Sequence, residues 1–566
     1  MNRTAEEYAQ LAEDWVNAYE GDAPALERLN AYYERSFTHA DLKAEIWRRV
    51  YAFRQRSSRV PKNYLQLAEA QLLLAQDAGF GNWEALMSAE ARESPPPGPT
   101  YDLDEQRQIA PRRRLASAEW DRLIDVIREH RISSVVANGL MTDTILGKLA
   151  NLDHVTHLRL GGSRELTDDG LLQLARMPQL QLLDLSEYPG GKLTDRGLEV
   201  LRHLPNLREF EMTWQSGISD VGVRNLRSCD QLERVNLMGS PTGDGAIEAL
   251  QGKCRLRQFS TGRLTTDAGL RFLQNFPLLK QWPEPATGNC AAKKTGVTLL
   301  LDGPFTNSGL ASLAGLSGIQ ELDLFWHVSR ISADGFAHLV QLPNLVALGC
   351  DGKLSSDAAM VHIATMPRLR RLRIQESVAT DDGFVELSKS QSIESIWGRE
   401  CPNFGERGFL AFARMPSLRG LGIGLGKVSD GALSALPLFP ALRELTPIGV
   451  QDEGFVHVGR CKLLERLTCM YCREATDVAT EHIANLRITY YYAGLTKITD
   501  RSLEILGRMD SLEQVEFYEC LGVTDAGLPF LARLPNLREV HLDGLPNVTL
   551  EGTRVFPGQV RVKHSN

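Results

Sequence analysis

Long apolar runs are missing from this sequence. Nowhere do about 18 apolar residues follow one another, and the N-terminal residues MNRTAEEYAQLAEDW contain no apolar stretch of signal-peptide length. These absences argue against a membrane-spanning helix and against a secretory leader. We therefore expect no membrane partner and a cytoplasmic location.

An excess of basic residues is also missing. The chain has 63 Lys and Arg against 71 Asp and Glu, which gives a net charge of −8 and a pI near 5.9. Because phosphate binding needs clustered Lys and Arg, this balance argues against a general nucleic-acid binder. The nine cysteines, an odd number spread over a long chain, are typical of reduced, buried thiols rather than of a disulfide framework.

Catalytic and metal-binding motifs are missing as well. No histidine belongs to an HExxH sequence and no serine to a GxSxG sequence. Cys469 and Cys472 form a CxxC without a second pair or a βαβ setting, so we expect them to be repeat-position cysteines. The alternating glycines of Gly420 to Gly426 lack the lysine spacing of a phosphate-binding loop. We therefore expect no enzyme activity, no catalytic residue, no cofactor and no metal.

The sequence does contain a repeated unit, seen clearly at Leu193–Met212 (LTDRGLEVLRHLPNLREFEM). Thr194 and Asp195 are good helix-cap residues, and three leucines between residues 198 and 204 share one helical face. Pro205 cannot continue a helix, and after it apolar and polar residues alternate, as in a strand. Each unit is expected to be one short helix followed by one short strand.

This unit returns along most of the chain, about every 22 to 27 residues. Its cap sequence TDxGL is intact at Thr167–Leu171 and at Thr524–Leu528. The period and the pattern resemble the leucine-rich repeat family, in the cysteine-containing subtype of ribonuclease-inhibitor-like proteins and F-box substrate receptors. The resemblance implies an α/β solenoid with a curved parallel sheet inside and helices outside, preceded here by a small all-α domain. It is specific for fold and not for function.

Three segments are expected. Residues 1–93 have apolar residues at helical spacing and form the N-terminal helical domain. Residues 94–114, with the sequence SPPPGP and three arginines at 112–114, form an extended Pro/Arg-rich linker with solvated charges. Residues 115–566 form the solenoid of about 16 or 17 repeats, with an insertion near residues 283–296. The insertion is either a loop beside the binding face or a drifted repeat.

The run AQDAGFGNWEAL at residues 75–86 resembles a short helical module found ahead of repeat arrays in bacterial proteins. This resemblance implies a bacterial source and a capping or docking role, without a biochemical activity. Residues 1–93 do not resemble an F-box, so recruitment of a ubiquitin ligase is not implied.

Candidate binding residues come from the strands. In a leucine-rich repeat the consensus apolar residues of each strand face the core, and the residues between them face the concave surface. From Ile319 onward this rule places large side chains where water is expected, which is typical of protein-binding hot spots. A register shifted by one residue would turn them inward. The partner-binding residues expected are Phe325, Trp326, Arg371, Arg373, Trp397, Arg399, Gly422, Met470, Tyr491 and Tyr518.

A more specific pocket is expected within this set. Three outward glycines of one strand, beside Trp397, would leave a shallow floor that a ligand backbone can approach closely. Arg371, Arg373 and Arg399 would form a basic rim able to bind a carboxylate bidentately.

The leading hypothesis is a non-catalytic scaffold or adaptor that binds a protein or peptide on the concave face. The alternative is a regulatory or enzymatic protein with its activity in the N-terminal helical domain and the repeats as its recognition module. A third, weaker hypothesis is nucleic-acid binding through the three arginines and Trp397. The sequence sets neither the partner nor the oligomeric state.

Overall fold

The computed structural model describes residues 5–33, 38–39, 42, 46, 65, 67–77, 83–88, 100–104, 107–186, 191–281, 296–325 and 327–565. The chain divides into two compact units, residues 1–278 and 279–566, which we describe separately. Trp326 and residues 283–295 of the expected insertion lie outside the described residues. Within the described residues, no helix combines the length and the apolar character needed to cross a bilayer.

Unit 1 begins with helices that pack on one another. Helix α1 contacts α2 and α4, and their shared core includes Trp15, Leu29 and Leu74. The buried Asp14 is held by Arg28, whose Nη2 lies 2.6 Å from Asp14 Oδ1. The helices described here are α1 (Ala5–Glu20), α2 (Ala23–Tyr32), α4 (Leu67–Asp77) and α5 (Trp83–Ser88).

The segment expected to be a linker differs from that expectation. Strands β1 (Tyr101–Leu103) and β2 (Gln108–Pro111) form an antiparallel hairpin, and β2 pairs in parallel with β3 (Ser134–Val136). The cause is Ile109, which is fully buried and pairs with Val135. Residues 108–111 therefore extend the sheet of the repeats instead of spacing it from the helices.

The arginines at 112–114 are paired within the chain. Arg112 contacts Asp102 across the hairpin, Arg113 contacts Glu119 at 2.6 Å, and Arg114 contacts Glu165 at 2.6 Å. These groups are partly exposed, so each pair adds little stability.

The remaining strands of unit 1 pair in parallel in chain order from β3 to β8, and a helical segment precedes or follows each of them. The strands are β4 (His157–Arg159), β5 (Leu182–Asp184), β6 (Glu209–Glu211), β7 (Arg234–Asn236) and β8 (Gln258–Ser260). The helices are α6 (Ser117–Glu129), α7 (Asp143–Leu149), α8 (Asp168–Leu172), η1 (Gln173–Arg176), η2 (Gly197–His203), α9 (Asp220–Val223), η3 (Arg224–Ser228), α10 (Asp244–Ala249), α11 (Asp267–Phe272) and η4 (Leu273–Asn275). In the repeat at 193–212 the expected helix is η2, a 3₁₀ helix.

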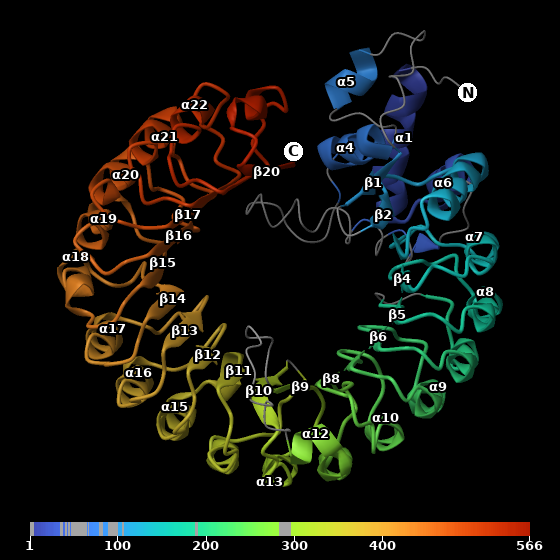
Figure 1. Ribbon diagram of the computed structural model, residues 1–566, viewed down its shortest axis with the longest axis horizontal. Helices are drawn as coiled ribbons and strands as arrows, with labels where there is room; N and C mark the ends of the chain where they lie inside the picture. The colour runs from blue at the N-terminus through green and yellow to red at the C-terminus, as the bar shows by residue number, and fades with distance from the viewer. Residues whose placement is uncertain are drawn as a thin grey trace. The chain divides into compact units, whose positions relative to one another are not determined.

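Unit 2 repeats the same strand and helix alternation, with parallel strands on the inner side of an arc and helices on its outer side (Figure 1). The strands are β9 (Val297–Leu301), β10 (Ile319–Leu324), β11 (Ala347–Cys350), β12 (Arg371–Arg373), β13 (Ser395–Gly398), β14 (Gly420–Gly424), β15 (Glu444–Ile448), β16 (Arg466–Met470), β17 (Tyr490–Gly494), β18 (Gln514–Tyr518), β19 (Glu539–Asp543) and β20 (Arg561–Ser565). The helices are α13 (Asn307–Ala311), α14 (Gly335–Leu339), η5 (Gly352–Leu354), α15 (Asp357–Ala364), α16 (Asp381–Leu387), α17 (Glu406–Phe412), α18 (Asp430–Leu433), η6 (Leu436–Leu438), α19 (Asp452–Val458), α20 (Asp477–Ile483), α21 (Asp500–Leu506), α22 (Leu528–Leu531) and η7 (Gly552–Val555), and α12 (Pro277–Lys280) spans the boundary between the units.

The cap sequence TDxG links each repeat to the next. Asp500 accepts the backbone N–H of Thr524 at 2.8 Å and its hydroxyl at 2.7 Å, and the same two bonds join Asp452 to Thr476. The glycine of the sequence has a steric reason, since a Cβ on Gly527 would lie 2.5 Å from Asp500 Oδ1. The carboxylate of one repeat thus fills the space that a side chain of the next repeat would need.

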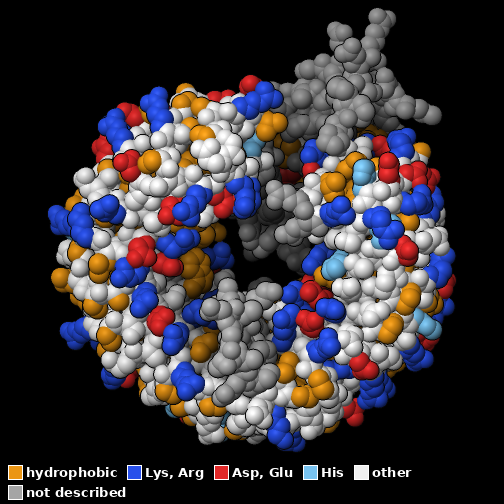
Figure 2. Space-filling view, in the orientation of Figure 1, with side chains coloured by type: hydrophobic (Ala, Val, Ile, Leu, Met, Phe, Trp, Pro, Cys, Tyr) orange, Lys and Arg blue, Asp and Glu red, His pale blue; other side chains and the backbone are white. Residues whose placement is uncertain are grey.

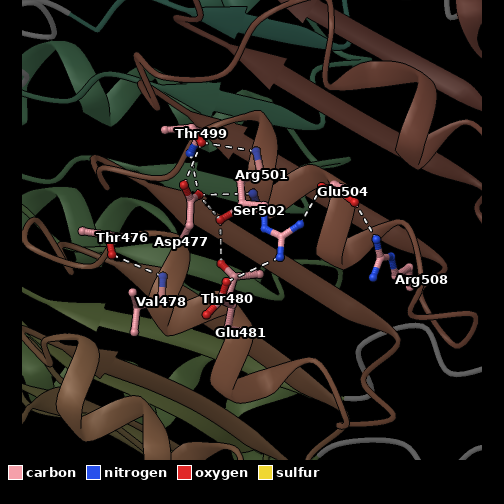
Figure 3. Close-up of polar contacts among 10 residues, drawn as sticks. All are labelled: Thr476, Asp477, Val478, Thr480, Glu481, Thr499, Arg501, Ser502, Glu504 and Arg508. Atoms are coloured by element: carbon pink, nitrogen blue, oxygen red, sulfur yellow. Dashed lines mark hydrogen bonds and ion pairs between the residues drawn. The ribbon is translucent and has the colours of Figure 1, made fainter.

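One step of this ladder has a serine in place of the glycine (Figure 3). Asp477 accepts the backbone N–H of Thr499 at 2.8 Å and that of Ser502 at 3.1 Å, together with both of their hydroxyls. Burial acts to raise the pKa of Asp477, but the hydrogen bonds from Ser502 and Thr499 outweigh it and hold that pKa below its usual range.

Candidate binding face

The outward face of unit 2 follows from the strand register. Glu321, Ala347, Arg371 and Ser395 pair in sequence across β10 to β13, and each is partly or fully exposed. The leucines one position further along, such as Leu348, are buried. Alternation of apolar and polar residues therefore places the outward side chains correctly on these strands.

The structure places most of the expected binding residues at outward positions. These are Phe325, Arg371, Arg373, Trp397, Arg399, Met470 and Tyr518, all of them at least partly exposed. Gly422 occupies an outward position but is buried. Trp326 lies outside the described residues.

The expectation for Tyr491 is wrong. This residue is 2 % exposed and pairs with Leu467 and Val515, which are core positions of the neighbouring strands. Tyr490 and Tyr492 face outward in its place. Three successive tyrosines offer no apolar and polar alternation to fix the register; pairing with the flanking strands does so.

The basic rim is not free to bind a carboxylate. Arg371 Nη2 lies 2.7 Å from Glu321, and Arg373 Nη2 lies 2.7 Å from Asp323. Each pair spans the intervening strand β11, where Ala347 and Gly349 leave room for it. A Cβ on Gly349 would collide with both Asp323 and Arg373. These two arginines are therefore already neutralised by acidic side chains two repeats away.

The glycine strand β14 is not an open floor either. The ring of Trp397 lies against Gly422, where it occupies the space of a Cβ. Arg399 follows directly after β13. Its side chain reaches past β14 and β15 to Tyr471, with Nη1 3.4 Å from the tyrosine hydroxyl. Small residues on β14 thus let large side chains of β13 lie flat over the sheet.

Arg399 is weakly held in this position. Apart from the long bond to Tyr471, its charged neighbour is Glu400, 3.5 Å from Nε. The Nε atom is buried and has no hydrogen-bond partner within the described part of the chain. The side chain is therefore held by one long hydrogen bond and one long ion pair.

A second aromatic group, missed by sequence reasoning, lies on β16 to β18. Arg466 stacks on Tyr490, with its guanidinium carbon 3.8 Å from the ring centre. Burial, with a contribution from the Glu516 carboxylate, raises the pKa of Tyr490 to about 12. Tyr492 faces the same side as Met470 and Tyr518, so the outward surface from β13 to β18 is rich in large side chains.

Unit 1 has a different outward surface. Arg159 lies 3.5 Å from Asp184 and 3.4 Å from Glu211, and Arg234 lies 3.1 Å from Glu209. Burial, with the nearby Asp184 carboxylate, raises the pKa of Glu211. This face is a network of paired charges and has few large apolar groups.

Cysteines and metal ligands add no site to these faces. Cys469 and Cys472 are buried free thiols, and burial raises the pKa of Cys472 to about 12. Within the described residues, no three His, Cys, Asp or Glu side chains are grouped so that they could hold a metal ion.

The cap ladder, the parallel strands and the alternating core residues together define the fold of a leucine-rich repeat solenoid. No protein-family model matches the chain. A stretch of 74 residues, 13 % of the chain, is 32 % identical to human mitochondrial ATP synthase subunit s and spans 37 % of that protein's length.

Solved structures with a similar arrangement share little sequence with this chain. The structure of the yeast Rad7 and Elc1 complex is 15 % identical, with a TM-score of 0.31 over 79 % of this chain and 88 % of that chain. The TLR13–ssRNA13 complex is 13 % identical, with a TM-score of 0.45 over 82 % of this chain and 70 % of that chain. An internalin (inlF) of Listeria monocytogenes is 13 % identical, with a TM-score of 0.23 over 80 % of this chain and 94 % of that chain. Likeness at this level does not bear on function.

Proposed function

We propose that the outward face of β10 to β18 binds a protein or peptide and that the chain acts as a non-catalytic scaffold or adaptor. The observation that carries the proposal is the arrangement of Trp397 on the glycine strand and of Arg399 against Tyr471. Tryptophan, tyrosine and arginine dominate the energetics of protein interfaces. Here Trp397 lies on Gly422 and Arg399 reaches Tyr471, and all three side chains are partly exposed.

The charges of this face favour a protein partner over a nucleic acid. Arg371 and Arg373 are paired with carboxylates, and Arg466 is stacked on Tyr490. Hydrophobic side chains and charges of both signs are mixed on the visible surface of unit 2 (Figure 2). A phosphate backbone is bound by a continuous set of unpaired cations, whereas a mixed surface suits a protein.

The N-terminal helices give less support to the alternative function. Their described polar groups bond to one another, as in the pair Asp14 and Arg28 and in the contact of Trp15 Nε1 with the Tyr33 hydroxyl at 3.2 Å. Such groups stabilise a helical core. We therefore advance the scaffold and not an enzyme of the N-terminal domain.

The test is co-purification from a lysate of the native host. We expect the wild-type chain to retain a partner that the Trp397→Ala variant loses. The matched control is Leu438→Ala, which removes a hydrophobic side chain that is 71 % exposed in η6. A partner retained equally by all three proteins would contradict binding on this face. Circular dichroism of each variant checks that it is folded.

A further inference from the structure

A small pocket lies beside the outward face, at the carboxyl end of β10 to β12. It has a volume of about 290 Å³, and Phe325, Val328, Ile331 and Leu354 form its apolar walls. Val328 and Leu354 are buried, while Phe325 and Ile331 are partly exposed at the opening. The pocket can therefore hold an apolar side chain without any movement of the core.

Two residues of opposite charge, Lys353 and Glu376, line the pocket. Neither Glu376 nor Lys353 makes a side-chain hydrogen bond or ion pair within the described residues, and both are exposed. Asp351 also lines the pocket, but it is engaged by Arg373 at 3.2 Å and by the backbone N–H of Gln375 at 2.9 Å. Glu376 is thus the carboxylate that an incoming cation would meet.

The backbone of Glu376 follows a pattern of the repeat. Its φ is +55°, in the left-handed region that favours glycine. The preceding repeat has Gly352, with φ +58°, at the corresponding place in the same pocket. Glu400, Tyr471, Leu495 and Glu519 have the same conformation at the corresponding places of later repeats, so it belongs to the turn after the strand and costs some stability in each.

We propose that the pocket receives an apolar side chain of the bound peptide and that Glu376 binds a Lys or Arg next to it. This inference rests on the proposed function and deepens it, since it names the chemistry that the partner presents. The exposed Lys353 repels a second cation on its side. The occupant is a peptide segment that carries a basic residue next to an apolar one.

The test uses the full chain and three blocked peptides, acetyl-Gly-Leu-Arg-Gly-amide and its Leu→Ser and Arg→Glu forms, each labelled for fluorescence anisotropy. We expect the Leu-Arg peptide to bind at least tenfold more tightly than either altered form. Filling the pocket with Ser329→Trp should abolish this preference, because Ser329 is an exposed lining residue. Equal binding of the three peptides, or binding of none, would overturn the proposal.

The variant Glu376→Gly separates binding from structure. It should raise the melting temperature, because glycine adopts this backbone without strain, and weaken the Leu-Arg peptide at least fivefold. Glu400→Gly is the matched control: its φ is +57°, one repeat further on, and it does not line the pocket. It should raise the melting temperature and leave peptide binding unchanged. If Glu376→Gly binds like wild type, the residue has no part in recognition.

These outcomes are independent of the scaffold proposal. Trp397→Ala should leave peptide binding at the pocket intact, because Trp397 does not line it. Loss of the natural partner in Trp397→Ala, together with no peptide preference, would refute the pocket alone. If Trp397→Ala retains the natural partner and still prefers the Leu-Arg peptide, the proposed binding on the outward face would be refuted and the pocket proposal would stand.

Discussion

Arg373 donates from Nη2 to Asp323 Oδ1 at 2.7 Å, across the strand that separates them, and Gly349 is the residue between them. We expect Gly349→Ala to break this pair, because its Cβ would collide with both partners. The Arg373 side chain is 42 % exposed and that of Asp323 is 34 % exposed, so the lost ion pair itself is worth less than about 1 kcal/mol. With the overpacking, the free energy of unfolding should fall by about 1–2 kcal/mol.

Thermal unfolding of Gly349→Ala measures this effect, and Gly424→Ala is its control. A Cβ on Gly424 meets nothing within 4 Å, so that variant should be as stable as wild type or slightly more stable. Equal melting temperatures for Gly349→Ala and Gly424→Ala would show that the pair does not depend on the small residue between its members.

Gly422→Ala tests whether partner binding depends on the position of the Trp397 ring against Gly422. The added methyl group would occupy the position of the ring, so Trp397 must rotate away from β14. We expect a loss of about 1–3 kcal/mol from overpacking, and a loss of partner binding like that of Trp397→Ala. Gly424→Ala again serves as control. Binding that survives in Gly422→Ala would mean that the position of the ring over the glycine is unimportant for recognition.

The cap ladder predicts a large stability effect at Asp477. Asp477→Asn keeps the shape of the side chain but removes the charge that accepts four hydrogen bonds. Hydrogen bonds to charged groups are the stronger ones, so the variant should lose about 2–3 kcal/mol. Glu453→Gln changes an exposed side chain of the preceding repeat. This control should alter the melting temperature by less than about 1 °C.

The same carboxylate predicts a pH dependence. The pKa of Asp477 is lowered in the folded state, so its contribution is fully present above its unfolded pKa of about 3.9 and is lost as the pH falls through the lower folded value. The difference in melting temperature between wild type and Asp477→Asn should therefore be constant from pH 7 to 5 and shrink below about pH 4. A difference that grows on acidification would reverse the assigned direction.

Thiol reactivity separates the exposed Cys254 from the buried Cys469 and Cys472. Cys254 is exposed, whereas Cys469 and Cys472 are buried, and burial raises the pKa of both. Because the thiolate is the reactive form, iodoacetamide at pH 8 should label Cys254 within minutes and leave the other two unlabelled in the native protein. Mass spectrometry after digestion gives the result. Rapid labelling of Cys472 would show that this repeat opens easily.

The repeat and most of its register were predictable because they rest on short-range patterns. The TDxGL cap and the alternation after Pro205 each involve fewer than about ten residues, and they fix one strand at a time. The hairpin at residues 101–111 escaped prediction because the SPPPGP sequence before it and the three arginines after it are typical of a linker, whereas the buried Ile109 between them decides the structure.

The arrangement of the binding face was less predictable. Alternation predicts that Trp397 and Arg399 point outward. It does not predict that Trp397 lies on Gly422 or that Arg399 reaches Tyr471, 72 positions away. The pairing of Arg371 with Glu321 likewise spans 50 residues and needs the register of three strands. Side chains that meet across repeats are set by the packing of whole strands, which a local pattern does not contain.

The dissociation constant of the captured partner is the most direct measure of where this protein binds. For Trp397→Ala we predict at least a tenfold increase relative to wild type, equivalent to about 1.4 kcal/mol of binding free energy. For Leu438→Ala we predict no change. A Trp397→Ala constant equal to that of wild type, in a variant with an unchanged circular dichroism spectrum, would contradict binding on the outward face of β10 to β18.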